Sequence, residues 1–430
     1  MSTVRVGLLG CGNVGASVVR LVQEQRSAIR ARTGLDLEIT RVAVRNVSKE
    51  RPVVLADDVL THDAASVVDD PDVDVVVEVI GGIEPARELT VQAVKAGKPV
   101  VTANKELLAN VGAEIFAAAE SAGVDVLFEA AVAGGIPLIR PLRESLAGER
   151  IRRVIGIVNG TTNFILTRMS EDGSTYAEAL AEAQSLGYAE RDPSADVEGY
   201  DAGAKAAIIA SIAFGAGVVA GDVYHEGIAG VTPEDIAFAR QLGYAVKLLA
   251  VAEAFGADAD LEVAVRVHPA MVPLTHPLAA VRESFNAVFV EGEAVGDLMF
   301  YGRGAGGDPT ASAVIGDLID AAANLRQGSS GSVGSLGKAR IRPIDDLESE
   351  YYLNMDVYDR PGVLAQVAGV FGDHGVSIRS MEQEGLGDEA RLIFITHTAL
   401  ESAVQATLTD LHKLECVDRV GSVLRVVGEE

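Results

Sequence analysis

Strand-length stretches rich in Val, Ile and Leu alternate with amphipathic helical patterns over the first part of the chain. They lie at 4–9, 38–44, 73–80, 98–101 and 124–128. The stretch 73–80 is almost entirely apolar, which is typical of a parallel strand covered on both faces. The pattern therefore predicts an α/β domain over residues 1–130, built on a doubly wound parallel sheet.

The pattern changes twice further along. Residues 131–308 mix strand and helix signals, and we predict an α+β domain there. A helical pattern at about 309–326 begins with proline, and we expect this helix to return to the first domain and complete it. Residues 327–350 are rich in Gly and Ser, which predicts a flexible linker. Residues 351–430 predict a separate βαββαβ domain.

The first apolar stretch leads directly into a glycine-rich turn and a helical pattern. This arrangement is the dinucleotide-binding motif of a Rossmann-type domain. Gly10 permits the tight turn, Gly12 lets a pyrophosphate approach the backbone, and Gly15 allows close packing of helix on strand. We therefore predict a cofactor site at Gly10, Gly12, Asn13, Val14 and Gly15, where the helix N-terminus supplies amide donors. A purely structural turn is the alternative.

The choice of cofactor depends on the end of the second predicted strand. Ala43 lies there, and Arg45 follows in place of the acidic residue that would bond an adenosine ribose. A cation at this point accommodates a 2′-phosphate, so NADP is predicted in preference to NAD. Lys49 and Arg51 add charge nearby, and the alternative is that all three are solvated loop cations.

Composition restricts the possible partners and the compartment. The chain carries 36 Lys and Arg against 62 Asp and Glu, a net charge of -26, which argues against nucleic acid because phosphate-binding surfaces need clustered cations. No apolar run reaches the roughly 20 residues of a membrane-spanning helix, and no signal peptide is expected. Cys11 and Cys416 lie in different predicted domains. We therefore expect a cytoplasmic protein without disulfides.

Candidate catalytic groups occur in two places. Lys105 follows a predicted strand, at the edge where doubly wound sheets bind ligands, although an ordinary helix start is the alternative. Asp201 and Lys205 are spaced i, i+4 and share one face of a predicted helix. Such a pair alone is usually a surface ion pair of little energetic weight. Elsewhere, Glu129 opens a Gly-containing loop whose oxygens suit a hard cation, with a domain crossover as the stronger alternative.

Together these motifs resemble the homoserine dehydrogenase family, in the family's order and over essentially the whole chain. Arg303 is a departure, because the family usually has proline at this point of its Gly-rich loop. The segment Asp359-Arg360-Pro361-Gly362-Val363-Leu364 resembles the ACT domain, a module that binds small amino acids. The motifs that carry the resemblance are Gly10 to Gly15, Thr102-Ala103-Asn104-Lys105, Asn159-Gly160-Thr161-Thr162-Asn163, Leu186-Gly187-Tyr188-Ala189-Glu190, Asp192-Pro193, Asp196, Asp201, Lys205 and residues 301–311.

The resemblance implies a hydride transfer that interconverts L-homoserine and L-aspartate 4-semialdehyde in threonine, methionine and isoleucine biosynthesis. It assigns proton transfer to Lys205 and a second catalytic position, where cofactor and substrate meet, to Lys105. Burial and the mutual repulsion of the two lysines would tune their pKa values.

The resemblance also implies a set of contacts. The implied substrate residues are Gly187, Glu190, Asp196 and Asp201, with Glu190 and Asp201 on the substrate ammonium and Asp192 in support. The implied cofactor residues beyond the glycine-rich turn are Ala43, Arg45, Lys105, Gly187 and Gly302. A structural sodium or other monovalent cation would be held by the Glu129 side chain and by the carbonyls of Val132, Gly134 and Ile136.

The ACT-like tail implies feedback inhibition by threonine, and a homodimer or homotetramer is expected. The alternative is an assembly domain without a ligand. Two other functions compete with the dehydrogenase. A phosphorylating aspartate-semialdehyde dehydrogenase needs a thiol nucleophile, and neither Cys11 nor Cys416 is placed for it. A non-catalytic sensor of NADP and amino acids would keep both binding folds without turnover.

Overall fold

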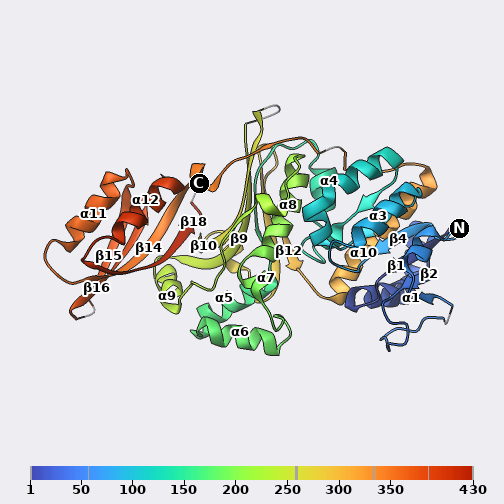
Figure 1. The fold of residues 1–430 in the computed structure, drawn as a ribbon, viewed down its shortest axis with the longest axis horizontal. Coiled ribbons are helices and arrows are strands. Elements are labelled where there is room, and N and C mark those ends of the chain that lie inside the picture. The colour runs from blue at the N-terminus through green and yellow to red at the C-terminus, as the bar shows by residue number, and fades with distance from the viewer. Residues whose placement is uncertain are drawn as a thin grey trace.

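The computed structural model describes residues 2–56, 58–256, 260–331, 333–334, 336–385 and 387–428. A six-stranded sheet lies near the N-terminus, and a twelve-stranded sheet runs through the middle of the molecule to its other end (Figure 1). Helices cover both faces of the first sheet, and other helices pack against the second. Of the predicted linker, Ser332 and Ser335 lie outside the described residues.

The first sheet is parallel, in the order β3-β2-β1-β4-β5-β6, and it confirms the predicted doubly wound fold. The middle strand β4 is completely buried at its three valines, as expected for a strand with helices on both faces. The strands are β1 (Ser2–Leu9), β2 (Leu35–Ala43), β3 (Leu60–Thr61), β4 (Val75–Glu78), β5 (Val100–Thr102) and β6 (Val126–Leu127). The helices between them are α1 (Asn13–Thr33), α2 (Ala64–Asp69), α3 (Ala86–Lys95) and α4 (Lys105–Ala122).

Two separate apolar cores cover the two faces of this sheet. Apolar residues of α1 pack with those of α10 (Gly307–Gln327) on one face, and those of α3 and α4 pack on the other. Helix α10 thus reaches the first sheet from far along the chain. Its Asp308 carboxylate accepts a hydrogen bond from the Ser17 hydroxyl of α1 at 2.8 Å and forms an ion pair with Arg20.

The central domain is a mixed α+β layer of long strands and helices. The sequence patterns did not predict its long antiparallel strands. Its strands run in the order β12-β11-β7-β9-β10 and are β7 (Ile151–Ile157), β9 (Tyr244–Phe255), β10 (Glu262–Pro273), β11 (Phe285–Gly292) and β12 (Gly296–Arg303), with the short β8 (Tyr224–His225) beside β10. The helices are α5 (Gly160–Asp172), α6 (Tyr176–Ser185), α7 (Ser194–Val197), α8 (Tyr200–Phe214) and α9 (Pro233–Gln241).

Helix α8 lies on the central sheet and also faces α4 of the first domain (Figure 1). Small side chains fill most of its buried positions, among them Ala202, Gly203, Ala206 and Ala207, so the helix can approach its neighbours closely. This helix carries Asp201 and Lys205, which places both residues at the boundary between the two domains.

The C-terminal domain has the predicted βαββαβ order. Its elements are β14 (Glu348–Tyr358), α11 (Val363–Asp373), β15 (Ile378–Gly385), β16 (Glu389–Thr396), α12 (Glu401–Leu411) and β18 (Val417–Val426), with β17 (Ala399–Leu400) at the edge of β14. Its sheet, however, is not separate. Strand β18 pairs in parallel with β10 at Ala270↔Arg425 and Met271↔Val426, so the tail extends the central sheet.

The predicted linker is docked on the rest of the protein at several points, and among them Gly337 is bonded through its backbone. The Gly337 amide donates to the Gly215 carbonyl at 2.7 Å, and the Gly217 amide donates to the Gly337 carbonyl at 2.9 Å. These contacts fasten the linker to the chain just beyond the C-terminus of α8. Nearby, the short β13 (Arg340–Ile341) pairs with β10.

Across the described residues, none of the helices has both the length and the apolar character needed to pass through a membrane.

Substitutions can distinguish the packing role of Gly15 from the cofactor-binding role of Gly12. A Cβ at residue 15 would lie 2.2 Å from the Gly10 carbonyl oxygen, so Gly15→Ala must push α1 away from β1. We expect it to lower the free energy of unfolding by ~1–3 kcal/mol in urea titrations. A Cβ at Gly12 meets nothing within 4 Å, so Gly12→Ala should keep the wild-type stability and weaken only dinucleotide binding, measured by calorimetry. Equal stability of the two variants would contradict this.

Candidate functional site

A cleft of about 910 Å³ lies where the first domain meets the central domain. Its walls include the start of α4, the turn after α6, α7 and α8, and the loop after β12. All the residues predicted to be catalytic or to bind substrate line it: Lys105, Gly187, Glu190, Asp196, Asp201 and Lys205. Residues separated by up to a hundred positions in the sequence are thus brought to one place.

The centre of the cleft is a carboxylate shared by two lysines. The Lys105 ammonium donates to Asp201 Oδ1, and the Lys205 ammonium donates to Asp201 Oδ2 at 2.7 Å. Lys205 also donates to the Val158 carbonyl at 2.7 Å. Lys105 comes from the first domain and Lys205 from the central domain, so Asp201 bridges the two sides.

Asn159 fixes the carboxylates from behind. Its Nδ2 donates to Asp201 Oδ2 at 2.9 Å and to Asp196 Oδ1 at 2.7 Å. Its Oδ1 accepts from the Thr162 amide at 2.9 Å and thereby caps the start of α5. One side chain therefore orients two acidic groups of the cleft and begins a helix.

The opposite charges of Asp201 and Lys105 stabilise each other's ionised forms. Burial alone would raise the pKa of Asp201, but the ammonium groups of Lys205 and Lys105 hold it well below its ordinary value. Burial would lower the pKa of Lys105, yet Asp201 outweighs it and the Lys105 pKa lies above its ordinary value. The expected tuning by repulsion between the lysines is therefore overridden for Lys105, because a carboxylate lies between them. Burial raises the pKa of Asp196.

Lys105 follows Asn104, whose side chain lies within hydrogen-bond distance of Glu78, a buried residue for which the sequence predicted no role. Asn104 caps α4, accepting from the Leu107 amide at 3.1 Å, and donates to the Gly82 carbonyl at 2.7 Å. Glu78, fully buried at the end of β4, accepts from the Thr102 hydroxyl at 2.6 Å and from the Ile80 amide at 2.8 Å. A carboxylate at the carboxyl end of an apolar strand was the available signal.

The glycine-rich turn fits a dinucleotide. Space is open where a Gly12 side chain would be, and α1 begins at Asn13 with no side chain capping its first amides. The loop after β12 closes on the same helix, since a Cβ at Gly307 would lie 2.7 Å from the Ser17 hydroxyl. Gly302 itself does not line the cleft among the described residues, whereas residues 303–306 do. The Arg303 guanidinium lies 5.8 Å from the centre of the Phe285 ring.

The cations after β2 differ in their surroundings. Arg45 is exposed. Arg51 donates to the carbonyls of Asn46 at 2.6 Å and Lys49 at 2.7 Å, and its buried Nε has no hydrogen-bond partner among the described residues. Burial raises the pKa of the Cys11 thiol, and the nearby Arg51 works against that shift. Arg51 thus lies beside the glycine-rich turn. The sequence had placed Arg45 at the cofactor phosphate and predicted only additional positive charge from Arg51.

The residues of the predicted cation site fit a cation only in part. The Glu129 carboxylate accepts hydrogen bonds from the amides of Ile139 at 2.7 Å and Arg140 at 2.9 Å, and also from the Leu138 amide. These bonds already compensate its charge. No group of three or more His, Cys, Asp or Glu suitable for a metal occurs in the described ranges. The role of the Val132, Gly134 and Ile136 carbonyls as cation ligands stays a prediction.

A buried carboxylic acid lies behind the Glu129 loop. Asp317 of α10 accepts from the Glu129 amide at 2.8 Å and from the Arg140 guanidinium at 3.1 Å. Burial raises the pKa of Asp317 to about 7, with the nearby Glu129 charge acting in the same direction.

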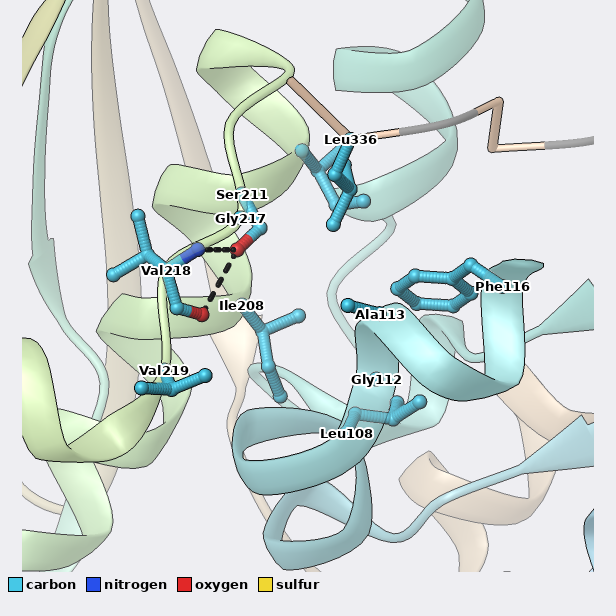
Figure 2. Close-up of a pocket in the computed structure, with 11 residues that line it drawn as sticks. Leu108, Gly112, Ala113, Phe116, Ile208, Ser211, Gly217, Val218, Val219 and Leu336 are labelled. Carbon is cyan, nitrogen blue, oxygen red and sulfur yellow. Dashed lines mark hydrogen bonds between the residues drawn. The ribbon is translucent and has the colours of Figure 1, made fainter. Parts of the chain in front are cut away.

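A second, apolar cavity of about 100 Å³ lies between α4 and α8 (Figure 2). Leu108 and Phe116 come from α4, Ile208 from α8, and Leu336 from the linker. Ser211 has the polar side chain of this lining, and its hydroxyl is hydrogen-bonded to the Val218 backbone. The residues that line the cavity therefore include no acidic or basic side chain. We assign this cavity to imperfect packing behind the two lysine-bearing helices.

Known proteins match the whole chain. Residues 10–129 match the homoserine dehydrogenase NAD-binding domain, residues 137–319 match homoserine dehydrogenase, and residues 351–416 match the ACT domain. Homoserine dehydrogenase of Corynebacterium glutamicum is 51% identical, over 99% of this chain and 96% of the relative.

Solved structures agree with these matches. The crystal structure of a homoserine dehydrogenase from Thiobacillus denitrificans has a TM-score of 0.92 at 42% identity and covers 99% of each chain. A hyperthermophilic archaeal homoserine dehydrogenase in complex with NADPH has a TM-score of 0.64 at 28% identity, over 75% of this chain and 98% of that one.

Asp317 should make stability depend on pH. Its pKa is about 7 in the folded protein against an ordinary value of 3.8, so the folded state binds an additional proton between these values. The free energy of unfolding should therefore fall as pH rises from about 4 to about 7, and the fall should be smaller in Asp317→Asn. Urea titrations across this range measure it, with the exposed Asp297→Asn as control. Parallel pH curves for the wild type and Asp317→Asn would contradict the assignment.

Proposed function

The chain belongs to the homoserine dehydrogenase family of NAD(P)-dependent oxidoreductases, and from this premise we propose that it interconverts L-homoserine and L-aspartate 4-semialdehyde with NADP. The observation that carries the proposal is the Lys105, Asp201 and Lys205 cluster, assembled from both domains in one cleft. The cleft adjoins the glycine-rich turn at Gly306, because a Cβ at the next residue, Gly307, would lie 3.3 Å from the Asn13 carbonyl oxygen. The chemistry supplied by the bound nicotinamide is hydride transfer.

The carboxylates of the cleft are suited to hold the substrate ammonium. Asp201 and Asp196 are held by one amide, and Glu190 is exposed in the same lining. An arriving ammonium competes with the two lysines for Asp201, because all three are cations that need the same oxygens. Binding of the substrate thus adds a positive charge beside each lysine, and this repulsion favours transfer of a proton from a lysine ammonium to the substrate oxygen.

Lys205 is the residue we assign to the proton. Its ammonium is held by Asp201 and by the Val158 carbonyl, and its side chain is only 12% exposed. It would give a proton to the oxygen of the aldehyde during reduction and take it back from the alcohol. Lys105 lies at the start of α4 in the first domain and donates to the same Asp201 carboxylate. We assign it to orienting the reacting oxygen.

NADP is favoured by the charges after β2. Arg51 and the exposed Arg45 follow that strand, Arg51 Nε has no hydrogen-bond partner within the described part of the chain, and an archaeal relative binds NADPH. A 2′-phosphate would accept from these guanidiniums.

The C-terminal domain supports regulation. An ACT domain is a module for small effectors, and we propose L-threonine, the end product of a biosynthetic route through homoserine, as the inhibitor. A homodimer or homotetramer is the assembly we propose.

Removing the Lys205 amine should separate chemistry from binding. Lys205→Ala is expected to lower kcat with homoserine by ~10²–10⁴-fold, because general acid–base groups contribute about this much. NADP affinity should stay near the wild-type value. Nicotinamide absorbance measures turnover and calorimetry measures binding, with the exposed Lys95→Ala as control. Retained turnover would reject the role of Lys205. Absence of turnover in the wild type with either cofactor would favour the non-catalytic sensor.

Cofactor preference should respond to the two arginines. Arg45→Ala and Arg51→Ala are each expected to raise the KM for NADP by roughly tenfold, the size expected for one lost charge-assisted hydrogen bond to phosphate, and to change the KM for NAD little. The exposed Arg32→Ala on α1 is the control. If the ratio of the two KM values is the same in both variants as in the wild type, these residues do not select the cofactor.

A further inference from the structure

The turn that leads into β11 supplies part of the wall of the catalytic cleft. Its residues Ser284 and Phe285 line the cleft, as do Gly160 and Thr161 at the start of α5. The turn and the helix are in close contact, because a Cβ at Gly160 would lie 2.6 Å from the Ser284 carbonyl oxygen. The position of this turn therefore determines how much room the cleft has beside the start of α5.

The backbone of this turn, residues 281–285, has an unusual conformation. Glu283 has a φ of +55°, in the left-handed region that a residue with a side chain seldom occupies. Such a residue keeps this conformation only when its surroundings hold it there. The turn therefore depends on contacts with the rest of the central domain.

Asn163 of α5, one helical turn after the capping Asn159, supplies three of these contacts. Its Nδ2 donates to the carbonyls of Val281 at 3.3 Å, Glu283 at 2.8 Å and Phe285 at 3.3 Å. The Asn163 side chain is buried and does not line the cleft as described. Its influence on a bound substrate must therefore pass through the backbone of the turn.

A buried lysine completes the arrangement. Lys247 of β9 donates to Asn163 Oδ1 at 3.2 Å and to the Val281 carbonyl, and only 5% of the residue is exposed. Burial lowers the pKa of Lys247 to about 8, and the charge of Glu171 acts against this shift. The amine therefore still carries its proton at neutral pH, so its hydrogen bonds to both oxygens are charge-assisted.

The next turn of α5 holds Glu283 itself. The Glu283 amide donates to the Thr167 hydroxyl at 3.2 Å, and the Glu283 carboxylate accepts from the Arg168 guanidinium at 3.3 Å. The same helix thus holds the turn along one face and the acidic residues of the cleft at its N-terminal cap. A displacement of the turn would be transmitted to those acidic residues through the start of α5.

We propose that Asn163 and Lys247 are positioning residues of the dehydrogenase, which hold residues 281–285 against the start of α5 and so fix the substrate side of the cleft. Their part in the reaction rests on the proposed function. Loss of either side chain should let the turn and the start of α5 separate. The carboxylates held by Asn159 would then lose their fixed positions, and the substrate would bind less tightly.

Lys247→Met is the first test, because methionine keeps most of the bulk of the side chain and removes the buried charge. The urea midpoint of unfolding should stay near the wild-type value, since removal of a buried charge offsets the loss of two hydrogen bonds. The KM for homoserine should nevertheless rise by roughly tenfold, the size expected for lost charge-assisted hydrogen bonds. NADP affinity, measured by calorimetry, should not change, because the glycine-rich turn lies in the other domain.

Asn163→Ala is the second variant, and it should raise the same KM at least as much because it removes the contacts with three carbonyls. KM separates positioning from a loss of folded protein, since a partly unfolded sample lowers only the apparent kcat. Lys98→Met is the matched control. Lys98 also donates to two backbone carbonyls, those of Val68 at 2.6 Å and Asp70 at 2.5 Å, but it lies in the first domain. Its loss should leave the KM for homoserine unchanged.

Hydrogen exchange gives a second measurement that does not need turnover. The Glu283 amide, which is bonded to Thr167, should exchange faster in Lys247→Met and Asn163→Ala than in the wild type. The proposal is overturned by an unchanged KM in both variants, by an equal rise in Lys98→Met, or by unchanged exchange at Glu283. A wild type without turnover would instead reject the dehydrogenase, and exchange at Glu283 would then decide whether the two residues hold the turn.

Discussion

One buried carboxylate, Asp201, holds the catalytic cleft together. It neutralises a lysine from each of two domains, and neither lysine has another carboxylate at hydrogen-bond distance among the described residues. A charge that is 7% exposed would be costly to bury unpaired, and two ammonium groups compensate that cost. The arrangement therefore links the two domains across the cleft and fixes the positions of both lysine amines. Asn104 and Asn159 cap the helices on the two sides of this contact, and the buried Glu78 lies within hydrogen-bond distance of Asn104.

Local patterns predicted much of the fold and part of the site. The glycine-rich turn was predictable because its neighbours, a strand and a helix, are adjacent in sequence. The pairing of Asp201 with Lys205 follows from the geometry of one helix turn. The contact of Asp201 with Lys105 spans 96 positions and two domains, so spacing could not reveal it, and only the resemblance to a family brought these residues together.

Other features escaped prediction for physical reasons. The long strands β9 and β10 pair with each other and are buried on both faces over most of their length. Their sequences therefore lack the alternation of apolar and polar residues that would mark a half-buried strand. Glu78 has the appearance of an ordinary strand residue, and its role depends on Thr102 and Asn104, which follow it by 24 and 26 positions at the junction of β5 and α4. The tail has the pattern of an independent domain, because a sheet that continues across a domain boundary leaves no trace in composition.

The pairing of the C-terminal sheet with the central sheet affects how the edge of the central sheet is protected. Because β18 pairs with β10 at Ala270 and Met271, it covers part of an edge of the central sheet as well as closing its own domain, while β8 and β13 pair with other parts of β10. Without β18, Ala270 and Met271 of β10 would have no strand beside them on this edge, and unpaired strand edges recruit strands from other molecules. The C-terminal domain therefore also protects this short part of the central sheet, which stays unpaired during synthesis until β18 has been made.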